Sequence, residues 1–410
     1  MAEVEERIKQ RIREQGQITF AQFMEMALYY PGLGYYTSPQ QRIGADGDFF
    51  TSPATHPLFA ALIGLQLEEM WQLLGTPADF TVVELGAGSG LLGQDILTYL
   101  PHFNPRLSQS MTYIAQEKER SWVVQGKQDS PQPHEGIIGC FLSNEFFDAL
   151  PTHRVLMLEG KLKEIYVTLE GDQFKEVVAE PSTPLLEQRL AEEGILLSEG
   201  YTTEINLEID TWVDETARRL KRGFVLTIDY GYEAQQLYSP QRKTGTMTTY
   251  FSHNWGVNPY LRAGERDMST HVDFTALIGR GQKKGLHCWG LVSQRQFLLN
   301  LGLDIFAEVL SQARLPLPQF MSNRYAMMQL IDPEGLGQFK VLVQGKGLPE
   351  SQLWGLTPDS VKKQALRAMK AELPLPLAGE EHTPLLQGKY PHYDSLSLES
   401  LFPEEELRHP

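Results

Sequence analysis

The chain has 410 residues, and its 36 Lys and Arg against 52 Asp and Glu give a formal net charge of −16. With 41% hydrophobic and 21% charged residues, the composition excludes disordered, collagen-like and coiled-coil proteins. The acidic balance excludes a general binder of nucleic-acid backbones, because that affinity comes from clustered Lys and Arg, and it favours a cationic partner.

The cysteines and the N-terminus indicate the cellular setting. Cys140 and Cys288 form neither a disulfide framework nor the spacing of a metal site, so we expect a reducing compartment and no metal. The charged N-terminus lacks the apolar stretch of a signal sequence, and no run approaches ~20 apolar residues. These features predict a cytoplasmic protein that does not insert into a membrane.

The first third of the chain reads as two helical stretches separated by a long loop. Apolar residues at helical spacing predict helix over residues 1–30 and again over 57–74. The loop between them is rich in Gly, Pro and aromatic residues, and loops of this length are usually functional. We expect four of its residues to fold over a bound cofactor: Asp48, Phe49, Thr51 and Ser52. The alternative is a turn that only seals the edge of a sheet.

A sheet with intervening helices follows. Apolar runs predict strands near residues 80–85, 111–115, 136–143, 224–229 and 339–345, and alternating β and α elements imply a mostly parallel sheet. Residues 287–294 are predicted to pair antiparallel with the last of these strands. Residues 153–179 break the rhythm and turn at Gly160 and Gly171, which predicts an inserted β-hairpin or meander. The Pro- and Glu-rich segment after Gly347 is predicted to be a loosely attached tail.

The sharpest local signal is a glycine-rich turn after the first strand, in which Glu84 is followed by Gly86, Gly88 and Gly90. A dinucleotide fingerprint would need a small residue where Leu91 stands, and the lysine of a P-loop is missing. The remaining pattern favours S-adenosylmethionine (SAM) as the ligand, with a purely structural turn as the alternative. The ribose of such a ligand would be bound by an acidic residue after the second strand.

Two neighbouring residues, Gln116 and Glu117, are candidates for that ribose contact. We prefer Glu117, because one carboxylate can accept hydrogen bonds from two hydroxyl groups. A solvent-exposed glutamate at the start of a charged helix is the alternative.

Six motifs in order along the chain resemble the MidA family of SAM-dependent methyltransferases: GDFFTSP (47–53), VVELGAGSG (82–90), SNEFFDALP (143–151), LTIDYGY (226–232), MSTHVDF (268–274) and FKVLVQG (339–345). The N-terminal segment ITFAQFMEMALYYPGLGYY is also similar to that family. The resemblance implies a class I methyltransferase fold with SAM as the methyl donor. In the characterised eukaryotic branch of the family, the acceptor is an arginine on a complex I subunit.

The resemblance and the patterns together predict an α/β, Rossmann-like class I SAM methyltransferase with a mostly parallel seven-stranded sheet, an N-terminal helical segment and an inserted β-rich substrate region. We assign residues 1–75 to the N-terminal helices and lid loop, and 76–152 with 201–346 to the methyltransferase domain. Residues 153–200 form the inserted substrate or docking region, and 347–410 form the tail.

The candidate acceptor site lies in the motif SNEFFDALP, which follows a strand at the edge where ligands bind in open α/β sheets. An arginine nucleophile is a guanidinium with five donors, and two carboxylates can clamp it and turn one nitrogen toward the methyl group. Glu145 and Asp148 lie three residues apart and can share one side of a turn, with Asn144 at the end of the strand. The alternative is an acid that caps a helix.

Two further segments contribute candidates. Asp229 ends another strand and either shapes the substrate pocket or caps the next helix. Asp267, His271 and Asp273 form a polar cluster, in which His271 is an active-site candidate or a structural histidine. Glu204 is a weaker candidate that the resemblance also suggests.

These observations predict a SAM-dependent enzyme, namely a protein arginine N-methyltransferase acting on a subunit of a respiratory or NAD(P)H dehydrogenase-type complex. A SAM-binding assembly factor with little catalysis and a small-molecule N- or O-methyltransferase are the alternatives. The oligomeric state is open, a dimer included.

Overall fold

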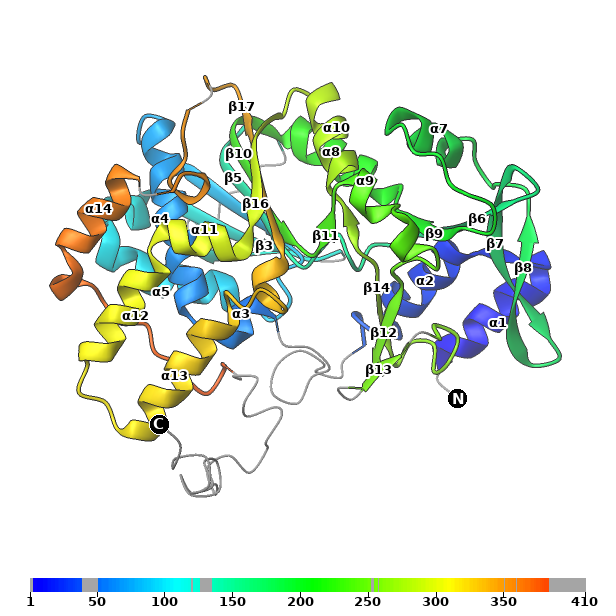
Figure 1. Ribbon diagram of the computed structural model, residues 1–410, viewed down its shortest axis with the longest axis horizontal. Helices are drawn as coiled ribbons and strands as arrows, with labels where there is room; N and C mark the ends of the chain where they lie inside the picture. The colour runs from blue at the N-terminus through cyan, green and yellow to red at the C-terminus, as the bar shows by residue number, and fades with distance from the viewer. Residues whose placement is uncertain are drawn as a thin grey trace, which may run out of the picture.

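The computed structural model describes residues 3–38, 51–118, 121–125, 135–251, 254–256, 258–349, 351–358 and 360–382. These residues form a larger and a smaller lobe, which lie at the left and right of Figure 1. Two of the expected lid residues, Asp48 and Phe49, fall outside the described ranges.

Within the described ranges, the larger lobe is built on a sheet of seven strands in the order β16-β17-β10-β5-β2-β3-β4. The strands are β2 (Phe80–Leu85), β3 (Met111–Gln116), β4 (Ser121–Gln125), β5 (Ile137–Asn144), β10 (Leu220–Asp229), β16 (His287–Ser293) and β17 (Lys340–Lys346). The four central strands β10, β5, β2 and β3 are mutually parallel. The predicted antiparallel pairing of β16 with β17 is confirmed.

The sheet is mixed rather than parallel throughout, because β17 and β4 run against their neighbours. Only residues 117–120 separate β3 from β4. A parallel pair needs a crossover of a dozen or more residues, so this short connection permits only an antiparallel pairing. The length of the connection therefore decides the direction of this edge strand.

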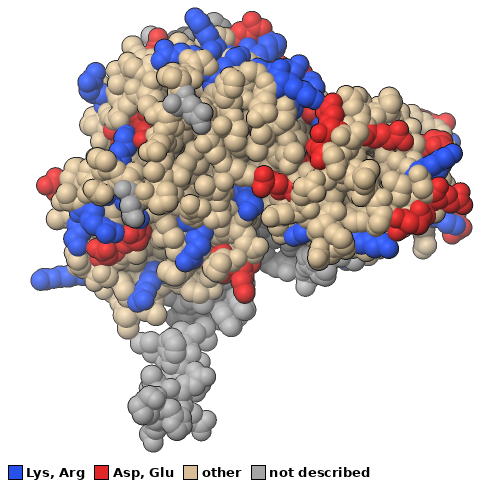
Figure 2. Space-filling view, turned by 45° about the horizontal axis from the view of Figure 1, so that its top comes forward, with Lys and Arg blue, Asp and Glu red and all other residues tan. Residues whose placement is uncertain are grey.

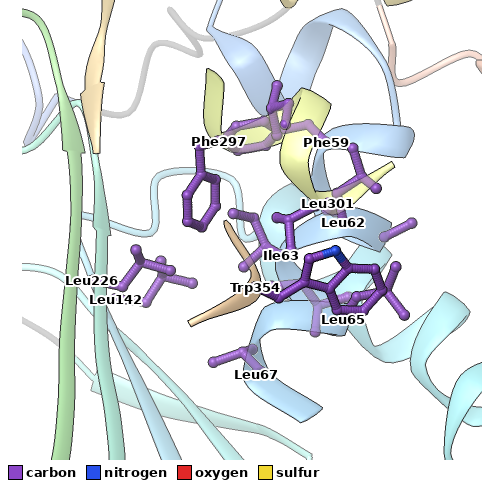
Figure 3. Packing of buried hydrophobic residues seen from close by; sticks show 14 of the residues in the cluster. Phe59, Leu62, Ile63, Leu65, Leu67, Leu142, Leu226, Phe297, Leu301 and Trp354 are labelled. Carbon is purple, nitrogen blue, oxygen red and sulfur yellow. The ribbon is translucent and has the colours of Figure 1, made fainter. Parts of the chain in front are cut away.

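Helices cover both faces of the larger sheet. Its first apolar cluster includes residues of α4 (Leu58–Leu73), α5 (Leu91–Phe103), α11 (Gln294–Leu301), α12 (Leu303–Gln312) and α13 (Leu317–Gln329). The second cluster packs α8 (Glu208–Arg219) and α10 (Phe274–Lys283) on the opposite face. Figure 3 shows Phe59 of α4 and Phe297 of α11 close together in the first cluster, with Leu226 and Leu142 side by side on the sheet at the left. The predicted helix over 57–74 is confirmed as α4.

The smaller lobe has a sheet of its own, formed by β1 (Ile18–Thr19), β6 (His153–Leu158), β7 (Lys161–Glu170), β8 (Gln173–Ala179) and β9 (Thr202–Ile205). One apolar cluster joins this sheet to α1 (Glu3–Gln15) and α2 (Phe20–Tyr29), and another joins it to α7 (Leu185–Glu192) and α9 (Ala234–Leu237). The chain turns at Gly160 and Gly171 as expected, with φ of +70° and +63°. β9 extends this sheet past the predicted end of the insertion at residue 200.

The single helix predicted over residues 1–30 is wrong. Gly16 has φ of +84°, and the chain then forms the short strand β1 before α2 begins. The Thr19 side chain accepts a hydrogen bond from the Gln22 amide, and the Gln22 side chain accepts one from the Thr19 amide. This capping box starts a new helix, so helical spacing continues while the helix itself is interrupted.

Short elements lie outside the two main sheets: α3 (Ser52–Thr55), α6 (Pro105–Ser110), β11 (Gly231–Tyr232), β12 (Thr248–Phe251), β13 (Asn254–Gly256), β14 (Asp267–Ser269) and β15 (Val272–Asp273). Met268 of β14 belongs to the same apolar cluster as α1 and α2. Strand β14 therefore packs against the N-terminal helices α1 and α2. Among the described helices, none is both long and apolar enough to cross a membrane.

The expectation of a loosely attached segment after Gly347 is wrong for residues 353–358 and 360–382. Leu353 and Trp354 are 1% and 5% exposed, and the Trp354 indole donates to the carbonyl of Asn300 at 2.7 Å. Farther on, α14 (Val361–Ala368) packs Leu366 into the same core. A few apolar anchors in a Pro- and Glu-rich segment are enough to bind it, because each removes a large area from water.

We expect Trp354→Ala to lower the free energy of unfolding by about 3 to 5 kcal/mol, the usual cost of removing a large buried aromatic side chain. Denaturant unfolding of the full chain measures this change. Val361→Ala is the matched control, because Val361 lies in the same C-terminal segment and is 81% exposed. Equal stability of the Trp354→Ala protein and the wild type would show that the segment is not part of the core.

Candidate functional site

A cavity of about 2100 Å³ lies at the carboxyl ends of β2, β5 and β10, between the two lobes. Pockets for single small ligands usually measure roughly 300 to 1000 Å³. The cavity is therefore large enough for a cofactor and a second reacting group. Its lining includes the glycine-rich turn, the turn after β5, residues of α2 and the short helix η2 (Leu336–Gln338).

The glycine-rich turn after β2 depends on glycine at each of its three positions. Gly86, Gly88 and Gly90 have φ of +70°, +55° and +80°, a backbone region that strongly favours glycine. A Cβ atom on Gly86 would lie 2.7 Å from the Phe146 ring, so this position is also closed by packing. Gly90 directly precedes α5. The first backbone amides of a helix have no partner within the helix, and this end of α5 lies at the cavity.

The two candidates for the ribose contact have different partners. The Gln116 side chain accepts a hydrogen bond from Arg219 at 2.8 Å and is not part of the cavity wall. Glu117 lines the cavity, and its Oε1 accepts the Gly88 amide at 2.5 Å. The geometry thus favours Glu117, because its carboxylate is hydrogen-bonded to the glycine-rich turn and lies next to the space that a ligand on that turn would occupy.

Glu84 lies at the base of this turn and is 4% exposed. Its Oε2 accepts the hydroxyl of Tyr113 at 2.9 Å, and burial raises the pKa of Glu84 to about 8. The side chain is thereby tied to β3. This arrangement suits a residue that supports the turn from below.

The described lid residues separate into two groups. Thr51 lines the cavity, whereas Ser52 is fully buried and its hydroxyl donates to Gln294 at 3.1 Å. The Ser52 amide also faces Glu145 Oε1, at 3.4 Å. Ser52 therefore joins α3 to the turn after β5, while Thr51 is the described member of the four that faces the cavity.

The turn after β5 brings Asn144, Glu145 and Asp148 to the cavity wall. Glu145 has φ of +51°, which is rare for a residue with a side chain, and such strain tends to occur at functional sites. Its Oε1 accepts the Asn144 amide group at 2.9 Å, and Asp148 Oδ2 accepts the Tyr230 hydroxyl at 2.5 Å. Burial, followed by the nearby charge of Asp148, raises the pKa of Glu145 to about 8. Burial also raises the pKa of Asp148.

Asp229 lies behind this turn rather than in the cavity wall. It is fully buried, and its Oδ2 accepts the amides of Phe146 and Phe147 at 3.1 and 2.9 Å. Burial raises the pKa of Asp229 well above its usual range. The pocket-facing placement expected for Asp229 is not what the structure has; the carboxyl supports the backbone of the turn that carries Glu145.

His271 lines the cavity and lies between two tyrosine rings, 5.4 Å from Tyr230 and 5.3 Å from Tyr232 by ring centroids. Burial, with a smaller effect of Arg242, lowers the pKa of His271 to about 4. The imidazole is therefore neutral near pH 7. Within the described residues, its buried Nδ1 has no hydrogen-bond partner.

Part of the wall comes from residues that the sequence did not single out, namely Tyr29, Tyr36 and Trp212, and Asp267 of the predicted polar cluster also lines it. Tyr29 and Tyr36 both lie within the N-terminal stretch 18–36 that already belonged to the family resemblance. Their position at the cavity depends on the packing of the smaller lobe against the larger one, which no local pattern predicts. The described residues contain no group of three or more His, Cys, Asp or Glu arranged to hold a metal ion.

Residues 62–292 match a protein family described as "Putative S-adenosyl-L-methionine-dependent methyltransferase". A Drosophila melanogaster protein named protein arginine methyltransferase NDUFAF7 homolog, mitochondrial, is 29% identical over 84% of this chain and 85% of its own length. The Mus musculus protein arginine methyltransferase NDUFAF7 is 28% identical over 80% of each chain. A Burkholderia thailandensis structure with bound S-adenosyl-homocysteine superposes with a TM-score of 0.71 at 27% identity, covering 86% of this chain and 94% of that one.

The similar proteins also bear on location. The animal relatives are named as mitochondrial proteins, which contradicts the cytoplasmic location predicted from the sequence. That prediction relied on the absence of a recognisable signal at the N-terminus. Such an absence does not report where a protein of this kind acts.

Proposed function

Because the chain belongs to this family and is therefore an S-adenosyl-L-methionine-dependent methyltransferase, we propose that it transfers the methyl group to an arginine side chain of a protein. The names of the similar animal proteins support the arginine acceptor. The proposed protein client is a subunit of a complex I-type respiratory assembly, as the family resemblance implies.

The observation that carries the arginine acceptor is a set of buried polar atoms without partners in one wall of the cavity, two of which are amide or carboxylate oxygens that accept hydrogen bonds. Asn144 Oδ1, Asp148 Oδ1 and His271 Nδ1 have no hydrogen-bond partner within the described residues. All three residues line the same cavity as the glycine-rich turn. Buried polar atoms in folded proteins are usually paired, so these three indicate a missing donor group. A guanidinium has five donors and no acceptor, which matches such a wall.

The glycine-rich turn fits the family's cofactor. Its three positive-φ glycines let a ligand approach the backbone closely, and the start of α5 presents amide groups beside it. We assign Gly86, Gly88 and Gly90 to the turn that holds the cofactor and Glu117 to the ribose. Thr51 would close over it, and Glu84 would hold the turn from below. The bound cofactor supplies the electrophilic methyl group.

The residues of the turn after β5 would orient the acceptor. Methyl transfer is an in-line displacement, so the main task of the protein is to align the acceptor nitrogen with the methyl carbon. Glu145 and Asp148 would bind the guanidinium edge, and Asn144 would fix the Glu145 carboxylate through its amide group. Neutral His271 would accept a further N–H. Asp229 would act as a positioning residue, because it holds the backbone amides of the turn.

Client recognition is proposed for the smaller lobe, whose helix α2 contributes Tyr29 to the cavity wall. On the face shown in Figure 2, acidic side chains gather on the smaller lobe, at the right, together with some basic ones. A protein segment with a reactive arginine is cationic, so an acidic approach favours its encounter.

We expect the specificity constant kcat/KM to rise about tenfold between pH 7 and pH 9. The sign follows from Glu145, whose pKa is about 8 in the free protein. Below this pH the carboxyl is mostly protonated and pairs poorly with a cation, and above it the carboxylate is available. Initial rates over this range test the expectation with the proposed client. A profile that falls over the same range would contradict an ionised Glu145 in the reaction.

The proposed function is tested by incubating the full chain with labelled SAM and a purified complex I-type subunit, followed by mass spectrometry of the subunit. Label on arginine supports the proposal. Label on another side chain, or SAM binding without transfer to any protein, would contradict it.

A further inference from the structure

We infer that Asp267, held by the hydroxyl of Tyr36, is a further carboxylate contact of the acceptor and that this pair selects a guanidinium over an ammonium group. The inference rests on the proposed arginine acceptor. It assigns a specificity role to the smaller lobe, which contributes Tyr36, and to β14, which contributes Asp267.

The geometry of Asp267 is that of a side chain fixed in advance. Its Oδ1 accepts the Tyr36 hydroxyl at 2.8 Å and its own neighbour's amide, that of Met268, at 2.8 Å. The residue is 3% exposed, yet it lines the cavity, as does Tyr36. Two donors to one oxygen fix the carboxylate plane, so little side-chain entropy is left to lose when an acceptor binds.

Asp267 lies close to the turn that carries Asp148. The Thr270 amide donates to the Asp148 carbonyl at 2.9 Å, which joins the end of β14 directly to that turn. Asp148 is 6% exposed, and its Oδ1 has no partner within the described residues although its Oδ2 accepts Tyr230. This unpaired oxygen, in a nearly buried carboxylate at the cavity, indicates that a donor group of a ligand belongs between the two aspartates.

Each of the two aspartates accepts a hydrogen bond from a tyrosine hydroxyl. Tyr230 donates to Asp148, and Tyr36 donates to Asp267. Each hydroxyl hydrogen is thereby used, so each phenolic oxygen can only accept a hydrogen bond from a group in the cavity. The wall formed by these four residues offers acceptors and disfavours any ligand that itself presents acceptor atoms, such as an amide or a carboxylate.

A guanidinium and an ammonium group differ in how they can use this wall. The guanidinium is flat and carries donors along two edges, so it can reach carboxylates on two sides at once, whereas an ammonium is a compact point charge. Next to Asp267, the rings of Tyr29 and Tyr36 are stacked, with centroids 5.5 Å apart and an angle of 26°, and they add a flat aromatic surface to this wall.

The test compares binding of Nα-acetyl-L-arginine N-methylamide and the matching lysine compound to the full chain saturated with S-adenosyl-homocysteine, by ligand-observed NMR. We expect the wild type to prefer the arginine compound. Asp267→Asn keeps the size of the side chain and should weaken arginine binding roughly tenfold or more, with at most about a threefold effect on lysine. Tyr36→Phe should reduce the same preference.

Tyr260→Phe is the matched control, because Tyr260 also donates to a carboxylate, Glu176 at 2.9 Å, but lies outside the cavity wall. Unchanged affinity for S-adenosyl-homocysteine shows that each variant is folded. Equal losses for the two compounds, or an Asp267→Asn protein that behaves like Tyr260→Phe, would overturn the specificity role alone. A wild type that binds S-adenosyl-homocysteine but neither compound would overturn the proposed arginine acceptor together with this inference.

Discussion

Replacing Gly88 by valine is expected to lower the affinity for SAM by more than about 100-fold, or about 2.7 kcal/mol. Gly88 has φ of +55°, and its backbone amide donates a hydrogen bond to Glu117, the proposed ribose contact. Gly88 therefore lies in the turn directly beside the proposed cofactor site. A β-branched side chain there would fill cofactor volume and disfavour the backbone conformation of the turn. Isothermal titration calorimetry of the purified protein measures the loss.

The matched control for this experiment is Gly171→Val. Gly171 has φ of +63° and open space where a Cβ would be added, so the substitution imposes similar backbone strain far from the cavity. The strain should cost each protein about 1 to 2 kcal/mol of stability. Comparable thermal unfolding with a loss of SAM binding only in Gly88→Val identifies the cofactor site. Normal SAM affinity in a folded Gly88→Val protein would mean that the cofactor binds elsewhere.

The second large effect is expected from Glu145→Gln, which at about pH 9, where the Glu145 carboxyl is ionised, should slow methyl transfer to a confirmed acceptor by roughly 10- to 150-fold, or about 1.5 to 3 kcal/mol. The amide keeps the size of the side chain and can still accept the Asn144 hydrogen bond through its oxygen. It removes the charge that pairs with the guanidinium. SAM affinity should stay within about twofold of the wild type, because Glu145 lies on the acceptor side.

Glu204→Gln is the control for this variant. Glu204 is a carboxyl in the smaller lobe, 6% exposed, that accepts the Thr246 amide and does not line the cavity. Its rate should match that of the wild type. If Glu145→Gln and the wild type transfer methyl groups equally fast, the carboxylate pair does not clamp the acceptor.

Glu145 also links the reaction to stability. Its pKa in the folded protein, about 8, lies above the value of about 4.3 expected in the unfolded chain. Folding therefore favours the protonated form, and the contribution to stability present below pH 4.3 is lost as the pH rises to 8. This carboxyl in the cavity wall therefore weakens the fold at the pH where the reaction needs its charge.

Much of the molecule follows from local patterns in the sequence. The β-branched run before the glycine-rich turn predicts β2, and helical spacing predicts α4, because both elements bury one face against a core. The turn itself could be assigned from its glycines and from the missing lysine of a P-loop. The antiparallel pairing of β16 with β17 was also predicted, from two apolar runs in the last part of the sheet domain.

Other features were decided by tertiary packing. The Pro- and Glu-rich composition after residue 347 predicted a loose tail, whereas Trp354 inserts into the core between α4 and α11. Composition averages over a segment and cannot detect one or two anchors. Similarly, the spacing over residues 1–30 is helical, but a positive φ at Gly16 ends the first helix and lets Ile18 pair with Val167 of β7.

The candidate site shows the same division. Glu145 and Asp148 were predictable because they lie within one short motif after a strand, and strand ends carry ligands in open α/β sheets. The backbone decided that Asp229 points behind that turn rather than into the cavity, and that Glu117 rather than Gln116 faces the cavity. Tyr36 and Asp267 are 231 positions apart and meet only because the smaller lobe packs on the larger one. Sequence alone determines the chemistry of each motif, but contacts between distant segments depend on the packing of the whole chain.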